Sequence, residues 1–93
     1  MLIENIGTAA MLEQTAEECV ELSQACLKLA RLIRGENPVY KDAKQIIDNL
    51  HEEIADVRIC IGELVQGEAV NDYEVQYWTD KKMERCKKRL KGA

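Results

Sequence analysis

The stretch from Asp42 to Gln66, DAKQIIDNLHEEIADVRICIGELVQ, predicts a long amphipathic helix. It contains no Pro, and its apolar residues recur with the period of a helix rather than with the alternation of a strand. On a wheel of about 100° per residue, one side of this helix gathers Ile46, Val57, Cys60 and Leu64. A helix with such a side buries it against other helices, so the stretch predicts an all-α protein.

Two breaks separate this helix from the rest of the chain. Before it, Gly35 suits a helix C-terminus and Pro38 prevents the preceding helix from continuing. After it, Gly67 is followed by Asn71 and Asp72, which are residue types that cap the start of a helix. The breaks therefore predict two further helices, one that ends near residue 33 and one over about residues 71–91.

The N-terminal region adds a possible short helix, because Thr8 after Gly7 is a residue type that caps the start of the first long helix. Three long helices joined by short loops predict antiparallel packing in a small bundle. We expect residues 1–93 to form a single domain, since the chain is short and has neither internal repeats nor low-complexity tracts.

The composition is that of a small globular helical protein. Of the 93 residues, 46% are apolar and 32% charged, and there is no Phe and one Trp. Strong helix formers dominate. A chain of this length buries only roughly 60–65% of the surface that it exposes when unfolded. Association with other subunits would therefore help to stabilise it.

The charge disfavours nucleic acid as a partner. Seventeen acidic residues against 13 basic ones give a net charge of −4, whereas proteins that bind nucleic acid non-specifically are usually basic. Residues 81–91 are an exception, with seven Lys or Arg and one Glu. This basic segment is either a solvated helix end, favoured by the helix dipole, or a surface that faces phosphate groups.

The cysteines indicate a reducing compartment. Cys19, Cys26, Cys60 and Cys86 are isolated, without a C-x-x-C pair, and the N-terminus lacks the basic region of a secretory signal. No apolar run approaches the roughly 18–20 residues that a membrane span requires. We expect a cytoplasmic protein without a membrane partner, whose thiols are reduced and fill core positions.

Two acidic pairs carry the functional prediction. Residues three apart share a helix face, so Glu18 projects with Glu21, and Glu53 projects with Asp56. On the wheel, Glu18 and Glu53 lie in the middle of the apolar stripes of their helices, and Glu21 lies at the edge of its stripe. Both helices thus place an acidic pair where a bundle has its core.

Four carboxylates buried side by side repel one another strongly. Protonation, pairing with Lys or Arg, or a divalent cation would relieve the repulsion; alternatively, these are ordinary exposed glutamates. Two such pairs favour the cation. His51 lies on the wheel face opposite Glu53, which disfavours a di-iron site built on Glu-x-x-His. Oxygen-only ligands suit Mg²⁺, with Mn²⁺ as a substitute.

The last predicted helix offers candidate phosphate contacts. Lys82 lies near Val75 and Cys86 on the wheel, so we expect it to face inward, and Arg85 lies one turn later. An equally good interpretation is a Lys whose stem covers apolar surface and a surface Arg. Tyr73, Tyr77 and Trp78 are more typical of core or subunit packing than of base stacking.

The motifs resemble one enzyme family. The segment QTAEECVEL at residues 14–22, the later Lys28 and Arg31, and EEIADV at residues 52–57 are similar to the E-E-x-x-E and E-x-x-D pattern of the MazG-like all-α nucleoside triphosphate pyrophosphohydrolases. A weaker likeness extends to KKMER at residues 81–85. The connection of 31 residues between Glu21 and Glu53 is long for this family.

The resemblance implies Mg²⁺-dependent cleavage of a nucleoside triphosphate between the α- and β-phosphates, which gives the monophosphate and pyrophosphate. It implies that Glu17 supports the metal site or orients the attacking water, and that the metal ligands are Glu18, Glu21, Glu53 and Asp56. It also implies a homodimer or a dimer-of-dimers tetramer. The alternative is a non-catalytic regulatory or interaction module that retains metal or nucleotide binding.

Overall fold

A computed structural model describes residues 1–36 and 42–92 of the chain, and all of its regular elements there are helices. In chain order these are α1 (Leu2–Ile6), α2 (Thr8–Arg34), α3 (Ala43–Gln66) and α4 (Asp72–Gly92). The prediction of three long helices after a short N-terminal one is confirmed. None of the helices in these two ranges is long and apolar enough to cross a membrane.

The end of α2 follows the predicted glycine. Gly35 has a φ of 70°, in the left-handed region that a residue without a Cβ adopts readily. Its N–H donates to the Leu32 carbonyl at 3.2 Å, and the Glu36 N–H donates to the Arg31 carbonyl at 3.0 Å. These bonds satisfy carbonyls at the helix end that have no partner within the helix. The predicted helix breaker Pro38 lies outside the described residues.

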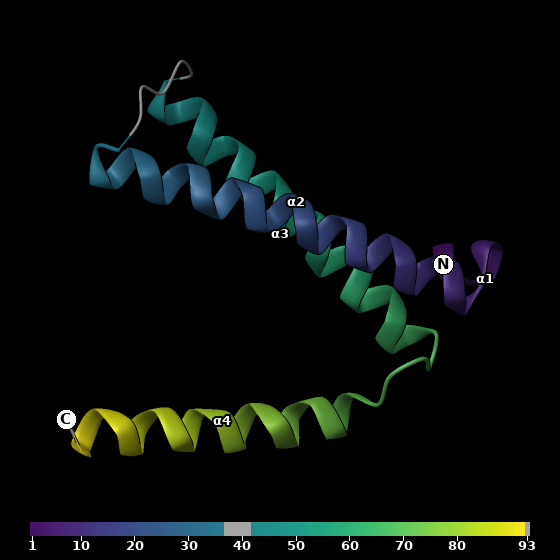
Figure 1. Ribbon diagram of the computed structural model, residues 1–93. Coiled ribbons are helices and arrows are strands. Elements are labelled where there is room, and N and C mark those ends of the chain that lie inside the picture. Colours follow the sequence, from purple (N-terminus) through teal and green to yellow (C-terminus); the bar gives the residue numbers. More distant parts are fainter. Residues whose placement is uncertain (37–41, 93) are drawn as a thin grey trace.

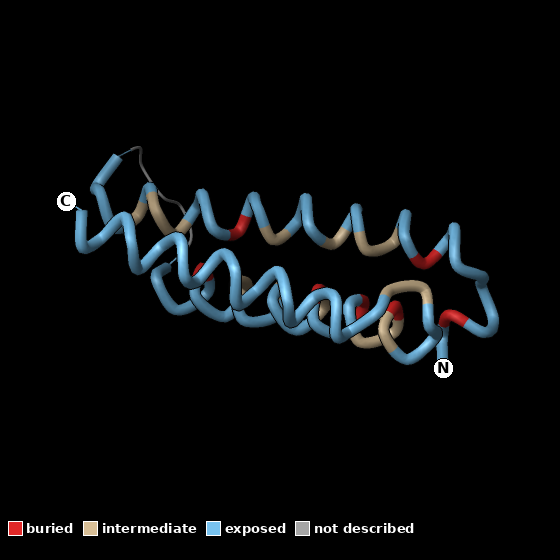
Figure 2. The backbone as a smooth tube through the Cα atoms, turned by 90° about the horizontal axis from the view of Figure 1, so that it is seen from below, coloured by how far each residue is buried: buried red, intermediate tan, exposed pale blue. Residues whose placement is uncertain are grey.

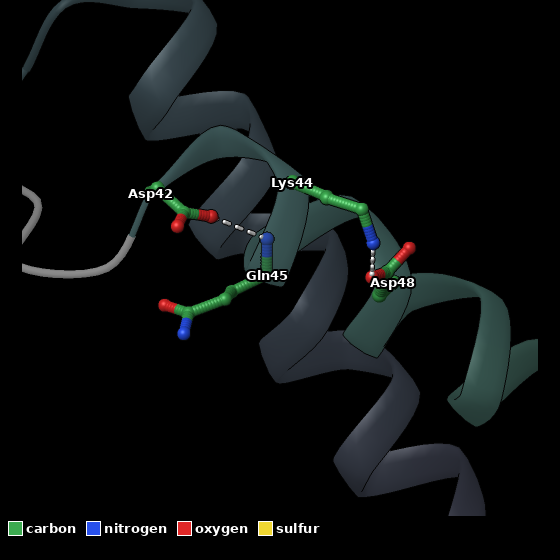
Figure 3. Close-up of polar contacts among 4 residues, drawn as sticks. All are labelled: Asp42, Lys44, Gln45 and Asp48. Atoms are coloured by element: carbon green, nitrogen blue, oxygen red, sulfur yellow. Dashed lines mark hydrogen bonds and ion pairs between the residues drawn. The ribbon is translucent and has the colours of Figure 1, made fainter.

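The start of α3 is capped by a side chain, as Figure 3 shows. The Gln45 N–H donates to Asp42 Oδ1 at 2.8 Å, which satisfies one of the free N–H groups of the first turn. Just beyond, Lys44 Nζ and Asp48 Oδ2 form an exposed ion pair at 2.7 Å, one helix turn apart. The sequence locates this helix start to within one residue.

The other two long helices begin differently from each other. At α4, Asn71 Oδ1 accepts a bond from the Glu74 N–H at 3.2 Å, so the capping role expected of Asn71 is confirmed. At α2, the prediction that Thr8 is the cap is wrong. Gly7, with a φ of 89°, is the N-cap, and Thr8 is the first helical residue. Backbone freedom at Gly7, rather than a hydroxyl, makes this break possible.

Helices α2 and α3 pack antiparallel as a hairpin, and α1 folds against the end where α2 begins and α3 ends (Figure 1). Helix α4 leaves this hairpin after the turn at residues 67–71 and runs apart from it. The prediction that all three long helices pack as one bundle is therefore wrong within a single chain. The radius of gyration is 16.9 Å, whereas a compact chain of this length has about 12 Å.

The main core cluster lies at the α1 end of the hairpin. Its buried residues are Ile3, Met11, Cys60 and Leu64, with Ala69 and Val70 of the following turn packed against them. A polar contact also holds α1, because the Ile3 N–H donates to Glu63 Oε1 at 3.0 Å. The turn after α3 is thus part of the core, and its packing there fixes the path of the chain at this point.

All the residues of α4 from Asp72 to Gly92 are exposed, whereas buried and half-buried positions recur along the hairpin (Figure 2). The exposed side chains include large apolar ones, such as Trp78 at 51%. The Trp78 ring meets the Tyr77 ring edge to face, with their centroids 5.4 Å apart. The amphipathic pattern of α4 therefore has no partner helix among the described residues.

Gly67 is required by the close approach of α1. A Cβ at this position would lie 2.6 Å from Ile3 Cγ2 and 2.8 Å from Ile3 Cδ1. We expect Gly67→Ala to lower the free energy of unfolding by about 1–3 kcal/mol, the usual effect of overfilling a packed site. Urea unfolding followed by circular dichroism measures it.

Gly62→Ala is the matched control, because a Cβ at Gly62 within α3 meets no atom within 4 Å. There, Ala should stabilise the protein by about 0.5–1 kcal/mol, since it favours helix more than Gly does. A Gly67→Ala protein as stable as the wild type would contradict the inferred packing of Ile3 against the turn.

Candidate metal centre

The hairpin brings the two predicted acidic pairs together. Glu18 and Glu21 on α2 face Glu53 and Asp56 on α3, and one carboxylate oxygen from each of the four lies within 4.8 Å of the others. The pairs are far apart in sequence, so only the register of α2 against α3 unites them. We call these four side chains the carboxylate cluster.

Two members of the carboxylate cluster take positions that are apolar elsewhere along the helix interface. Glu18 lies between two residues spaced seven positions before and after it, Met11 and Ala25, which are 0% and 1% exposed. Glu53 lies in the same way between Ile46 and Cys60, which are 3% and 5% exposed. A repeat of seven keeps side chains on the seam between two packed helices. The carboxylates therefore replace core residues, as the wheel predicted.

Glu18 and Glu53 each have a buried oxygen without a partner. The Oε2 atoms of both are buried and accept no hydrogen bond from the described residues. The other oxygen of Glu18, Oε1, accepts a bond from Gln14 Nε2 at 2.9 Å. In residues 1–36 and 42–92, no Lys or Arg forms an ion pair with the cluster. Buried charged oxygens are rarely left without compensation, so this arrangement calls for a cation or a proton.

The environment shifts the titration of these two residues in the same direction. Desolvation by the facing helix raises the pKa of Glu18, and repulsion from Glu21 and Asp56 raises it further, while the bond from Gln14 lowers it. Desolvation also raises the pKa of Glu53, and repulsion from Glu21, Asp56 and Glu18 raises it further. Without a cation, Glu18 and Glu53 therefore take up protons more readily in the folded protein than in the unfolded chain.

The residues present fit a hard divalent cation. All four side chains offer carboxylate oxygens, and these are the ligands that Mg²⁺ and Mn²⁺ prefer. Mg²⁺ takes six ligands and commonly keeps several waters, so four carboxylates leave room for water or phosphate oxygens. His51 is exposed on α3 and lies outside the cluster, as expected. The cluster could hold a metal ion.

Two residues beside the cluster were not predicted as part of the site. Gln14 contacts Glu18 from one turn earlier on α2. The feature of the sequence that indicates this contact is a polar side chain four positions before an inward-facing Glu. Cys60 follows Asp56 by one turn on α3 and is buried, whereas the other three cysteines are exposed, so the expectation that the thiols fill core positions is wrong for those three. Desolvation raises the pKa of the Cys60 thiol, and nearby Glu18 and Asp56 raise it further, although a hydrogen bond with Thr15 opposes them. A thiol that stays protonated suits packing rather than metal ligation.

The remaining predicted residues do not join the carboxylate cluster. Glu17 is exposed on α2, next to Glu18 in sequence but outside the group of four. Lys82 and Arg85 are exposed on α4, which runs apart from the hairpin. The expectation that Lys82 faces inward is wrong within one chain, because no helix in the described part of the chain packs along α4.

No protein-family model, curated protein or solved structure matches this chain. The resemblance to the MazG-like pyrophosphohydrolases therefore stays a prediction from the acidic motifs.

Proposed function

We propose that this protein is a Mg²⁺-dependent hydrolase that cleaves nucleoside triphosphates between the α- and β-phosphates. The observation that supports the proposal is the carboxylate cluster, with four acidic side chains converging within 4.8 Å and two of them in core positions. Maintaining such repulsion inside a small protein is costly unless a cation relieves it. The motif resemblance supplies the position of cleavage.

The chemistry requires a hard cation and water. A bound divalent cation neutralises charge on phosphate oxygens and lowers the pKa of a bound water. Gln14 fixes the orientation of the Glu18 carboxylate through its 2.9 Å bond. Glu17, which is exposed and precedes Glu18 on α2, would orient the attacking water and accept a proton from it. Water thus adds to the α-phosphorus, the bond to the bridging oxygen breaks, and pyrophosphate leaves.

Product analysis tests this proposal. Each common ribo- and deoxyribonucleoside triphosphate is incubated with the protein and Mg²⁺, and the products are separated by ion-exchange chromatography. We expect equal amounts of monophosphate and pyrophosphate, and no hydrolysis when EDTA is present. Release of orthophosphate with a nucleoside diphosphate would contradict cleavage at the α–β position.

A second candidate function is a regulatory module that binds metal or nucleotide without turnover. The observation that favours it is the distance of α4 from the hairpin, which leaves the expected phosphate contacts Lys82 and Arg85 outside the cluster. Heat of nucleotide binding in calorimetry, together with no product across the same panel, would support this function. Efficient turnover would exclude it.

A further inference from the structure

The seven basic residues of α4 are not spread evenly around the helix. On a wheel of about 100° per residue, four of them lie within about 60° of a fifth, Arg85. We call these five exposed side chains the basic face: Lys81, Lys82, Arg85, Lys88 and Arg89. The basic face covers about 12 Å of helix at 1.5 Å per residue.

The acidic residues of α4 leave the charge of the basic face largely intact. Asp80 and Glu84 lie about 140° and 100° from Arg85 on the wheel. Lys88 Nζ is 3.9 Å from Glu84 Oε1, but both side chains are exposed, so water and salt weaken this pair. Glu74 lies on the same side as Arg85, but it comes 11 residues earlier, about 16 Å along the helix.

Two aromatic rings border the basic face. Trp78 lies about 20° from Arg85 on the wheel, and Tyr77 lies at the edge of the face. Both aromatic residues are 51% exposed, so neither is packed in the core of the chain. Lys81 Nζ lies 5.8 Å from the centroid of the Tyr77 ring, which joins the aromatic pair to the cations. Surfaces that bind single-stranded nucleic acid combine these two features, because bases stack on the rings and phosphates meet the cations.

The acidic charge of the chain lies mainly outside α4. Residues 1–71 hold six basic and 13 acidic residues, whereas α4 holds seven basic and four acidic ones. Helix α4 diverges from the hairpin toward its C-terminal end, where the basic face lies (Figure 1). Salt screens exposed charges from one another beyond about 8 Å at physiological ionic strength. The net charge of −4, which disfavours nucleic acid for the chain as a whole, therefore does not describe the surroundings of α4.

We propose that the basic face of α4 binds single-stranded nucleic acid without sequence preference. Phosphates of the strand pair with the five cations, and bases stack on Trp78 and Tyr77. This binding activity belongs to α4, and the carboxylate cluster on the hairpin takes no part in it. It therefore goes beyond the proposed hydrolase function and does not depend on it.

The distribution of side chains on α4 favours a single strand over an anionic lipid surface or a duplex. A helix that lies in a membrane surface buries an apolar face among the lipids. On α4, the side opposite the basic face carries Asp80, Lys87 and Lys91 besides Met83 and Leu90, so burying it would also bury charges. The bases of a duplex are already stacked on one another, which leaves the two exposed rings without a role.

Fluorescence anisotropy of a labelled oligonucleotide tests the proposal. The probe is an oligothymidylate of about 20 nucleotides, longer than the usual site size, with a 5′ hydroxyl and a dye at its 3′ end. EDTA is present, so no metal-dependent hydrolysis takes place. The logarithm of the association constant should fall linearly with that of the salt concentration, with a slope of about −2 to −3.5 for about three to five neutralised phosphates. Absence of binding at low salt, or binding that does not respond to salt, would overturn the proposal.

A pair of double variants locates the binding surface on the helix. Lys88→Gln with Arg89→Gln removes two charges from the basic face, whereas Lys87→Gln with Lys91→Gln removes two charges from other sides of the same turns. The first pair should reduce the steepness of the salt dependence by about 1.4, which is about 0.7 for each lost phosphate contact, and the control by less than half as much. Circular dichroism should show equal helix content. Equal reductions in the two would overturn the assignment to this face.

Trp78→Ala tests base stacking, with Tyr73→Ala as its matched control. Tyr73 is exposed on the same helix, about 140° from Trp78 on the wheel. Trp78→Ala should weaken binding of the oligonucleotide by about 5- to 150-fold, the usual effect of losing a stacked base, and Tyr73→Ala by less than about twofold. An unchanged affinity of Trp78→Ala, or equally tight binding of a duplex of the same length, would overturn the choice of a single strand. Displacement of the oligonucleotide by phosphatidylglycerol vesicles at equal phosphate concentration would overturn it in favour of a lipid surface.

Discussion

Replacing Glu53 by Gln is expected to lower Mg²⁺-dependent pyrophosphate release by at least about 100-fold. Changing a residue that only supports a metal ligand has an effect of up to about this size, and Glu53 would be a ligand itself. Gln keeps the size and one oxygen of the side chain but removes the charge that faces Glu18, Glu21 and Asp56. The measurement is kcat/KM at saturating Mg²⁺ on the preferred nucleotide.

Glu52→Gln is the control for this variant. Glu52 precedes Glu53 on α3, but it is exposed and lies outside the carboxylate cluster. The same change in charge there should leave kcat/KM within about twofold, as expected for an exposed residue that binds no cation. Similar losses in both variants would show that the overall acidity of the surface, rather than the cluster, determines activity.

Mg²⁺ is expected to stabilise the protein by about 2.7 kcal/mol when its concentration is 100 times its dissociation constant. The physical reason is that the cation binds the folded carboxylate cluster, which exists only when α2 and α3 are paired. Urea unfolding with and without Mg²⁺ measures the increment. Glu53→Gln should shrink the increment and raise the stability of the metal-free protein, because it removes one of the repelling charges.

The pH dependence of stability should reverse with the metal. In the metal-free protein the pKa values of Glu18 and Glu53 lie above the ordinary value of 4.5. The folded state therefore binds more protons than the unfolded state. The protonated side chains contribute to the free energy of unfolding below pH 4.5, and this contribution is lost as pH rises through the raised pKa values. With Mg²⁺ bound, the carboxylates must be ionised, so acid should instead destabilise. Parallel trends with EDTA and with Mg²⁺ would contradict a metal centre.

The sequence predicts the helices and the carboxylate cluster well, for local physical reasons. Gly35, Asp42 and Asn71 act through their own backbone or side-chain bonds, so helix ends can be read from residue types. Glu18 and Glu53 occupy positions in a repeat of seven, and that repeat fixes which side chains meet between paired helices. The prediction for Thr8 is wrong because α2 begins after Gly7, whose backbone conformation starts the helix without a side-chain cap.

The position of α4 could not be predicted in the same way. Its amphipathic pattern indicates that it packs against something, but the pattern is the same for a partner in its own chain or in another. The residues just before α4, Ala69 and Val70, pack on core residues that lie far from α4 in sequence, such as Ile3 and Met11. The expectation that Lys82 faces the inside of a bundle is therefore wrong within one chain, where Lys82 is exposed.

The exposed ring on α4 gives this chain a built-in optical probe. Trp78 is the only tryptophan of the sequence, so the tryptophan emission of the protein comes from this one position. Trp78 is half exposed on α4 and distant in sequence from the carboxylate cluster. Its emission wavelength therefore depends on the solvent exposure of this helix. The emission wavelength of the native, unlabelled protein therefore reports changes in the surroundings of α4 at low concentration, while the hairpin stays folded.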